Sequence, residues 1–250
     1  MGPFPVLVAI HGGAFIVGDK REGHITKLLE VLDMGYALVS INYRLSREKI
    51  FPAAALDCRE AIRYIKKEAS TYSIDADRIG VIGFSAGANL AGILSMNVEN
   101  RKFYGEDEIR YPEYQPYVKA GVLWFAPTDF SKMDEQARQN GVSFQNHDDN
   151  NSPESLYVGA PIQKASAQII DAANPMTYIS DTMAKLLIEH GKLDKLVPYQ
   201  QSVIFTEALD EKGLSDKYHF VSLETADHED PQFESDENMM LVWEFIKANI

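Results

Sequence analysis

The sequence predicts an α/β fold with a mostly parallel central sheet and helices on both of its faces. Short apolar runs alternate with longer stretches of helical period, which is typical of parallel strands joined by crossover helices. The apolar runs are hydrophobic on both faces, as strands covered by helices on each side are. With 250 residues, 45% of them hydrophobic, the chain can bury a large core, so we expect a single domain over residues 1–250.

Six apolar runs of strand length predict the sheet, at residues 6–10, 37–42, 78–82, 118–125, 185–189 and 218–223. Five stretches of helical period follow them, at residues 24–34, 53–72, 86–96, 199–212 and 235–250. Gly35 and Gly213 follow two of these helices, where glycine commonly ends a helix.

Residues 130–174 interrupt this alternation after the fourth predicted strand. They are rich in Gln, Asn, Asp and Ser and contain no strand-like run. Stretches of this length between elements are usually lids or binding loops, so we predict a cap-like or lid-like insertion. Within it we interpret residues 147–151 as a solvated loop, because they lack the spaced ligands of a calcium loop. Residues 101–116 form a second irregular stretch beside the sheet.

The composition excludes several partners. The chain has 24 Lys and Arg against 37 Asp and Glu, a net charge of -13, which gives no basic footprint for nucleic acid or an anionic membrane. The only cysteine, Cys58, cannot form an intramolecular disulfide. No apolar stretch reaches the roughly 20 residues that span a bilayer. Because the first residues also lack a signal-peptide pattern, we expect a cytoplasmic protein, with secretion open if the amino end is truncated.

The segment Gly83-Phe84-Ser85-Ala86-Gly87 carries the clearest chemical signal. This G-x-S-x-G pattern directly follows a predicted strand and precedes a predicted helix, a context in which the serine hydroxyl projects from a sharp turn. We predict that Ser85 is a catalytic nucleophile. The alternative is a glycine-rich turn whose serine only caps the helix.

A serine nucleophile needs N–H donors for the oxyanion that forms when it attacks a carbonyl group. A glycine-containing turn, His11-Gly12-Gly13-Ala14, follows the first predicted strand. We predict that the amides of Gly12, Gly13, Ala14 and Ala86 form the oxyanion hole, and we interpret His11 as structural. The alternative is a turn that merely ends the strand.

The serine also needs a base and an acid that orients it. Asp194 follows the fifth predicted strand and His228 the sixth. Because the carboxyl ends of parallel strands face one way, Ser85, Asp194, His228 and the turn at Gly13 should meet in one crevice. Asp129, after the fourth strand, is the main rival acid. Other candidates are Glu224 and Asp227 as acids, and His24, His147, His190 and His219, to which we assign structural roles.

Substrate contacts are expected from Phe15, Phe84 and Val197, which lie within three residues of the predicted oxyanion-hole or catalytic residues in the sequence, and from Asp129, which follows the fourth predicted strand. The irregular stretches add aromatic residues that either line the site or pack the insertions: Tyr104, Tyr111, Tyr114, Tyr117, Phe144 and Tyr157. Polar aromatic walls suit sugar rings or an aromatic acyl group better than long lipid chains.

These motifs resemble the esterase and lipase branch of the α/β-hydrolase superfamily that has an HGG oxyanion motif, which includes hormone-sensitive-lipase-like and carbohydrate-ester-cleaving enzymes. The resemblance is carried by His11-Gly12-Gly13, Asn42-Tyr43-Arg44-Leu45, the segment around Ser85, the segment from His190 to Asp194 with Val197-Pro198, and His228. It implies a Ser-His-Asp carboxylic ester hydrolase that needs no metal or organic cofactor.

We favour short-chain or carbohydrate-linked acyl esters, such as acetyl or feruloyl esters of plant polysaccharide, as the small-molecule or saccharide substrate. A general short-chain carboxylesterase or lipase is the nearest alternative. A peptidase and a non-catalytic binding protein on the same fold are the others.

Two features depart from the family pattern. Members usually have two further strands before the HGG segment, whereas here only residues 1–5 precede the first predicted strand. Residues 37–42 should then form an apolar edge strand, which invites pairing with a second chain, a covering segment, or a longer natural protein. A monomer in sedimentation would count against the predicted homodimer. The second departure is Ala14, where many relatives have a third glycine.

Overall fold

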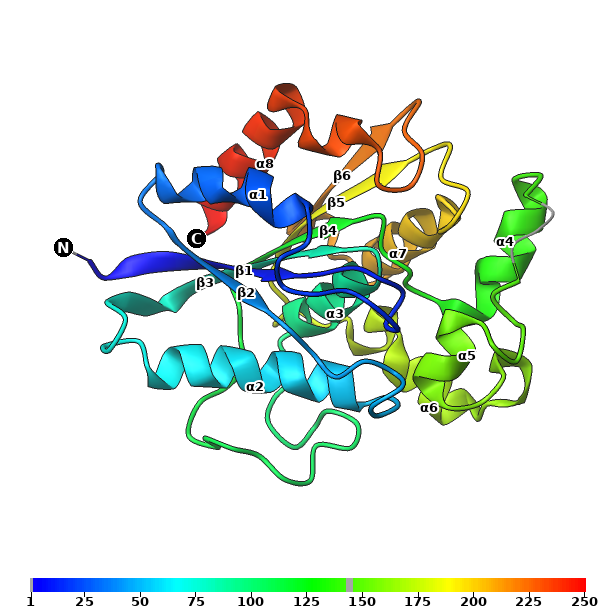
Figure 1. Cartoon of the computed structure of the whole chain (residues 1–250), viewed down its shortest axis with the longest axis horizontal. Coiled ribbons are helices and arrows are strands. Elements are labelled where there is room, and N and C mark those ends of the chain that lie inside the picture. The colour runs from blue at the N-terminus through cyan, green and yellow to red at the C-terminus, as the bar shows by residue number, and fades with distance from the viewer. Residues whose placement is uncertain (1, 143–145) are drawn as a thin grey trace.

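The computed structural model describes residues 2–142 and 146–250 and contains one parallel sheet (Figure 1). The strand order is β2-β1-β3-β4-β5-β6, and every neighbouring pair is parallel. The strands are β1 (Phe4–Ile10), β2 (Ala37–Ile41), β3 (Ile74–Phe84), β4 (Ala120–Trp124), β5 (Lys185–Gly191) and β6 (Tyr218–Leu223). All six predicted strands are confirmed, although β3 begins four residues before the predicted start at residue 78.

Helices cover both faces of this sheet, as predicted (Figure 1). Helices α1 (His24–Leu28) and α8 (Asp236–Asn249) cover one face; α2 (Ala53–Lys67), α3 (Ala86–Ser95) and α7 (Gln200–Glu211) cover the other. Short 3₁₀ turns lie at η1 (Leu29–Leu32), η5 (Ser215–Lys217) and η6 (Pro231–Glu234). The five predicted helices are present, but α2 ends five residues before the predicted boundary at residue 72.

The core explains why the strands read as continuous apolar runs. Val6, Val8 and Ile10 of β1 pack with the core on the α2 and α3 side, whereas Leu7 and Ala9 pack with the core on the α1 and α8 side. All five side chains are fully buried. Successive residues of a strand point to opposite faces, so a strand covered on both sides must be apolar at every position. Cys58 of α2 belongs to the core on the α2 and α3 side. It is also fully buried, and burial raises the pKa of its thiol.

The described parts of the insertion are helical and contain no strand. Its elements are η2 (Phe130–Lys132), α4 (Met133–Gln139), α5 (Pro153–Val158), η3 (Ile162–Lys164) and α6 (Ala167–Ala173), and η4 (Pro175–Tyr178) follows them. The hydroxyl groups of Ser152 and Ser166 accept hydrogen bonds from the first turns of α5 and α6, which fixes where these short helices begin. The insertion lies at one end of the sheet (Figure 1).

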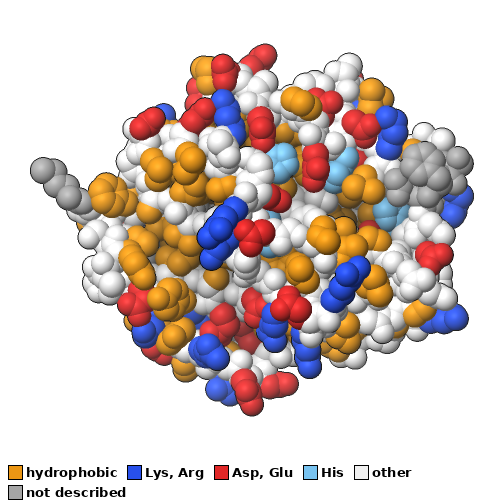
Figure 2. All heavy atoms as spheres, viewed as in Figure 1, with side chains coloured by type: hydrophobic (Ala, Val, Ile, Leu, Met, Phe, Trp, Pro, Cys, Tyr) orange, Lys and Arg blue, Asp and Glu red, His pale blue; other side chains and the backbone are white. Residues whose placement is uncertain are grey.

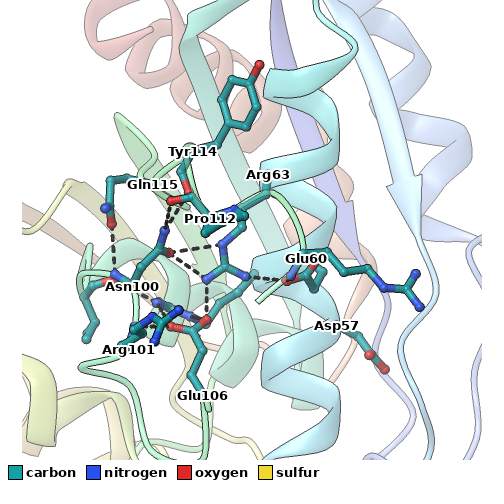
Figure 3. Close-up of polar contacts among 12 residues, drawn as sticks. Asp57, Glu60, Arg63, Asn100, Arg101, Glu106, Pro112, Tyr114 and Gln115 are labelled. Carbon is teal, nitrogen blue, oxygen red and sulfur yellow. Dashed lines mark hydrogen bonds and ion pairs between the residues drawn. The ribbon is translucent and has the colours of Figure 1, made fainter. Parts of the chain in front are cut away.

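The second irregular stretch is held against α2 by a buried polar cluster (Figure 3). Arg59 donates to both carboxylate oxygens of Glu106, at 2.7 and 2.8 Å, and Arg63 also pairs with Glu106. These three side chains are 1% exposed. Arg63 also donates to Glu60 and Asn100. Burial alone would raise the pKa of Glu106, but the two guanidinium groups outweigh it and lower the pKa. The cluster therefore fixes a segment that has no periodic apolar pattern.

Strand β2 forms one edge of the sheet, and Ala37, Leu38, Val39 and Ser40 are half-buried there. Pairing of this edge with a second copy stays a prediction. On the face drawn in Figure 2, Lys and Arg side chains are scattered among Asp and Glu side chains. Within residues 2–142 and 146–250, no helix is both long enough and apolar enough to cross a bilayer.

Glu189 of β5 provides a first testable prediction, on stability. Its side chain is fully buried, one carboxylate oxygen accepts a hydrogen bond from Asn238 at 3.0 Å, and burial raises its pKa from 4.5 to about 7. Between these pH values the unfolded chain loses the Glu189 proton while the folded chain keeps it. The free energy of unfolding therefore falls as pH rises, by up to about 3 kcal/mol in total.

Glu189→Gln removes this titration. We expect the difference in the free energy of unfolding between the variant and the native chain to change by up to about 3 kcal/mol in the variant's favour between pH 4.5 and pH 8. Urea unfolding at both pH values measures this difference, in which other titrating groups cancel. A difference that does not change with pH would show that Glu189 is ionised at pH 5 in the folded chain.

Candidate active site

Ser85 lies in a strained turn between β3 and α3. Its backbone φ of 52° and ψ of -120° are unusual for a residue with a side chain. The turn requires the glycines on both sides. A Cβ atom on Gly83 would lie 2.2 Å from the carbonyl oxygen of Gly87, and one on Gly87 would lie 2.2 Å from the carbonyl oxygen of Ile10. The pattern G-x-S-x-G thus follows from close backbone contacts that fix the serine in place.

The structure brings Ser85, His228 and Asp194 together. His228 Nε2 lies 3.0 Å from Ser85 Oγ, and His228 Nδ1 lies 2.7 Å from Asp194 Oδ2. The three residues follow β3, β6 and β5, so the parallel sheet brings residues 85, 194 and 228 to the same end. A hydroxyl group, an imidazole and a carboxylate in this chain of hydrogen bonds have the geometry of an activated nucleophile with its base and orienting acid.

Asp194 is fixed by more than the histidine. Its side chain is fully buried, and its Oδ1 atom accepts hydrogen bonds from the amides of Leu196 and Val197, each at 2.8 Å. Burial alone would raise the pKa of Asp194, but the interactions with His190 and His228 outweigh it and hold the pKa well below its usual range. Asp194 is therefore ionised at neutral pH and faces the catalytic imidazole with its other oxygen.

The rival acid has a different role. The carboxylate of Asp129 accepts hydrogen bonds from the amide and hydroxyl of Ser131, at 3.0 and 2.6 Å, and caps η2. Of the other candidates, Asp227 pairs with Lys195 and Glu224 with Lys192. His190, which we interpreted as structural, is fully buried with Ser202 and the carbonyl group of Val197 as partners.

Three of the four amides predicted for the oxyanion hole have no acceptor among the described residues: those of Gly13, Ala14 and Ala86. The fourth is engaged, because the Gly12 amide donates to both carboxylate oxygens of Glu22 at 3.3 Å. The structure therefore does not support Gly12 as a donor. Its part is spatial: a Cβ atom there would lie 3.1 Å from the carbonyl oxygen of Phe84.

Tyr43 supports the turn at residues 11–14, which follows β1. The Tyr43 hydroxyl donates to the carbonyl oxygens of His11 and Gly12, both at 3.1 Å, and its ring stacks on the His11 ring with the centroids 4.4 Å apart. His11 is 1% exposed, and burial lowers its pKa. His11 and Tyr43 thus hold the backbone turn from which the Gly13 and Ala14 amides project.

A cavity of about 100 Å³ lies at Ser85. Of the four predicted substrate contacts, Phe15 and Val197 line it. Phe84 and Asp129 do not: the Phe84 ring is fully buried in the core beside Trp124 and His24, and Asp129 caps η2. Strand alternation explains Phe84, since it follows Gly83 in β3 and its side chain points into the core on the α1 and α8 side.

The insertion supplies one wall of this cavity, through Asn146, His147, Pro153 and Glu154. Our interpretation of residues 147–151 as a solvated loop is wrong at His147, which is 5% exposed. Asp134 accepts the His147 amide at 2.6 Å, and Glu154 contacts its ring nitrogen Nδ1 at 3.0 Å. These contacts join positions up to 13 residues apart in an aperiodic segment, so they could not be predicted from the spacing of residues.

The candidate aromatic residues mostly pack the insertions. Tyr157 is 1% exposed and stacks on Phe15 with the ring centroids 3.8 Å apart. Tyr104 stacks on Phe51, and Tyr111 contacts Tyr64 beside a larger cavity of about 810 Å³ along α2, which Ser85 does not line. Phe144 lies outside the described residues. Volume alone does not identify the site, because the larger cavity contains none of the Ser85, His228 and Asp194 side chains.

In the part of the chain that the structure describes, no group of three or more His, Cys, Asp and Glu side chains is arranged to hold a metal ion.

Most of the chain matches the model of one known protein family. The model of the BD-FAE family matches residues 1–209. The chain belongs to the BD-FAE family. The matched range includes Ser85 and Asp194 and ends before His228.

This BD-FAE protein is similar in sequence to curated esterases and in structure to solved carbohydrate esterases. The probable carboxylic ester hydrolase LipM of Mycobacterium tuberculosis is 28% identical over 208 residues, which are 83% of this chain and 45% of LipM. The bifunctional GH43-CE protein of Bacteroides eggerthii has a TM-score of 0.83 at 30% identity, over 99% of this chain and 34% of that one. A truncated carbohydrate esterase from gut microbiota has a TM-score of 0.82 at 24% identity, over 99% and 86% of the two chains.

The fold is therefore that of the α/β-hydrolases, as the sequence predicted. The chain spans about half the length of the curated relatives it matches.

Proposed function

We propose that this BD-FAE protein is a serine carboxylic ester hydrolase. The observation that carries the proposal is the chain of hydrogen bonds from Ser85 through His228 to Asp194, with interatomic distances of 3.0 and 2.7 Å. The names of the relatives support the same reaction class, since LipM is a probable carboxylic ester hydrolase and LipQ an esterase. Because the family match ends before His228, the role of His228 rests on geometry and on its place after β6.

The reaction proceeds in two halves. Ser85 Oγ attacks the ester carbonyl carbon while His228 Nε2 takes the hydroxyl proton, and the amides of Gly13, Ala14 and Ala86 stabilise the resulting oxyanion. The bond to the alcohol oxygen then breaks, and the alcohol leaves with the proton from His228. Water attacks the acyl-serine ester with the same proton transfers, which releases the carboxylic acid and restores Ser85. Asp194 holds His228 in the tautomer that can accept the serine proton.

The cavity favours a short acyl group. A closed cavity of roughly 150 Å³ holds a benzene ring, so about 100 Å³ takes up an acetyl or propionyl group, whereas a feruloyl group or a long chain would extend beyond the cavity. The apolar side chains of Phe15, Val197 and Pro127 suit the methyl end of such a group. The names of the Bacteroides eggerthii and gut-microbiota neighbours favour a carbohydrate as the alcohol.

Acyl preference is a second testable prediction. We expect kcat/KM to be highest for p-nitrophenyl acetate or butyrate, at least about tenfold lower for octanoate, and negligible for palmitate, because an acyl chain longer than the cavity fits only by displacing the packed side chains that line it. Methyl butyrate should likewise be a better substrate than methyl ferulate. Initial rates over the whole series measure both. A rate that rises with chain length, or a preference for methyl ferulate, would contradict the short-acyl assignment.

A further inference from the structure

His190 is a buried histidine that contacts the carboxylate of Asp194. Its side chain is fully buried, and the Tyr199 ring, at the start of α7, packs edge-on against it with the ring centroids 5.8 Å apart. Nδ1 lies 2.7 Å from the hydroxyl oxygen of Ser202, and Nε2 lies 3.0 Å from the carbonyl oxygen of Val197. Nε2 also lies 3.3 Å from Asp194 Oδ2. The ring therefore lies between α7 and the proposed orienting acid.

These partners determine where the ring carries its proton. A carbonyl oxygen only accepts hydrogen bonds, so His190 Nε2 must be the donor to Val197. The second oxygen beside this N–H group also carries no proton, because the lowered pKa of Asp194 keeps its carboxylate ionised. The Ser202 hydroxyl donates to Nδ1 of a neutral ring and accepts from Nδ1 of a protonated one. His190 therefore presents an N–H group to Asp194 in either protonation state.

One oxygen of Asp194 is shared by two imidazole rings. His228 Nδ1 lies 2.7 Å from Oδ2 and His190 Nε2 lies 3.3 Å from it, whereas Oδ1 accepts the amides of Leu196 and Val197. An N–H group beside a carboxylate stabilises the negative charge and weakens its attraction for another cation. The positive end of the His190 N–H bond also repels a positive charge on the His228 ring. Both effects oppose the protonated form of His228.

We propose that His190 is a positioning residue that acts through Asp194: its Nε2–H group limits the attraction of Asp194 for protonated His228, so that His228 Nε2 stays free to accept the Ser85 proton at mildly acidic pH. The proposal rests on one part of the proposed function, namely that His228 is the base for Ser85. Without His190, the carboxylate would hold protonated His228 more strongly, and the enzyme would lose its base at a higher pH.

The pH dependence of ester hydrolysis tests the proposal. His190→Asn keeps a polar group near the position of Nδ1, for Ser202, and removes the donor beside Asp194. We expect the pH at which kcat/KM for p-nitrophenyl acetate falls to half its plateau, the acid limb, to rise by about half a unit or more. Below that pH, the variant should be at least about threefold slower than the native chain when each rate is divided by its own plateau.

A matched variant separates this effect from packing. The amide group of His190→Gln lies near the position of Nε2 and can donate to both Val197 and Asp194, so the acid limb should return to the native pH. His219→Asn, at an exposed histidine of β6, should change neither the limb nor the plateau. Thermal unfolding shows whether each variant is folded.

The other charged groups near His228 are the same in all of these variants. Asp227 accepts the His228 amide at 2.8 Å and pairs with Lys195 at 2.6 Å, and Glu229 follows His228 in the chain. Their effect on the acid limb cancels when variants at the same position are compared. A limb that differs between His190→Asn and His190→Gln therefore reports the contact with Asp194.

Two further measurements need no ester. The rate at which a fluorophosphonate labels Ser85 also depends on His228 as the base, so its pH dependence should show the same limb and the same shift. Nitrogen NMR of the native chain, with the His190 signals assigned from their loss in His190→Gln, should show a proton on His190 Nε2. This second measurement applies even if His190→Asn does not fold.

The outcomes are distinct. An acid limb of His190→Asn at or below the native pH, or a neutral His190 ring with its proton on Nδ1, would overturn the role of His190 and leave the esterase intact. Labelling of Ser85 that shows the shift, in a chain that hydrolyses no ester, would support this inference and overturn the proposed function. Absence of both hydrolysis and labelling would overturn the two together.

Discussion

Ser85→Ala should lower the kcat for p-nitrophenyl acetate by about 10⁴-fold or more. The substitution removes the oxygen that forms the acyl-enzyme. Without this oxygen, the histidine, the aspartate and the oxyanion-hole amides cannot take part in covalent catalysis. The Ser85 backbone has a φ of 52°, which alanine tolerates no worse than serine, so the fold should survive. Initial rates and thermal unfolding of both chains measure the two effects.

The control is an exposed serine outside the site. Ser215→Ala, in η5, should keep the native rate. Hydrolysis by Ser85→Ala near the native rate would contradict the nucleophile assignment. A native chain that hydrolyses no ester and yet reacts with a fluorophosphonate at Ser85 would have a working nucleophile and another substrate, whereas a native chain that does neither would be a binding protein on this fold.

Much of this site could be predicted because the parallel sheet determines where its residues lie. The residue that follows a parallel strand lies at the carboxyl edge of the sheet. The convergence of Ser85 after β3, Asp194 after β5 and His228 after β6 therefore follows from the positions of the strands. The strands could be predicted because burial on both faces makes them apolar throughout. The turn at Ser85 could be predicted because its backbone contacts leave no room for a Cβ atom and so require glycine at positions 83 and 87.

The sequence did not predict the polar contacts between irregular segments. Nothing in the spacing of His147, Asp134 and Glu154 reports that the insertion folds back on itself and lines the Ser85 cavity. The pairing of Arg59 with Glu106 across 47 residues is equally invisible. Such contacts depend on side-chain hydrogen bonds in place of a repeated apolar period, and only a period can be read along the chain.

The Gly12 amide shows the same limit at a smaller scale. The sequence placed the residue correctly in the turn before Ala14, but its N–H group is engaged by Glu22, ten residues further along the chain. A pattern of glycines predicts that amides are accessible, and it does not predict which amide a neighbouring carboxylate has already taken.

Asp194→Asn should lower kcat by about 10⁴-fold, and the structure says why the near-isosteric change is so costly. The Oδ1 atom accepts two amide hydrogen bonds, from Leu196 and Val197, so the oxygen of the asparagine must occupy that position. Its NH₂ group then faces His228 Nδ1, where the carboxylate lay at 2.7 Å. An NH₂ group can only donate there, which forces the ring proton onto Nε2.

The consequence falls on Ser85. His228 Nε2 lies 3.0 Å from Ser85 Oγ and must be unprotonated to accept the serine proton, so the wrong tautomer disables the base while every heavy atom stays in place. Steady-state kinetics on p-nitrophenyl acetate measure the loss, and thermal unfolding controls for the interaction with His190 that the variant also changes.

Asp129→Asn is the matched control, because the Asp129 carboxylate bonds to Ser131 and the structure gives it no contact with His228. It should keep a rate within about threefold of the native value. If instead Asp129→Asn abolished hydrolysis and Asp194→Asn did not, the orienting acid would be the residue after β4. The buried Asp194 would then serve only to hold His190 and the turn that follows β5.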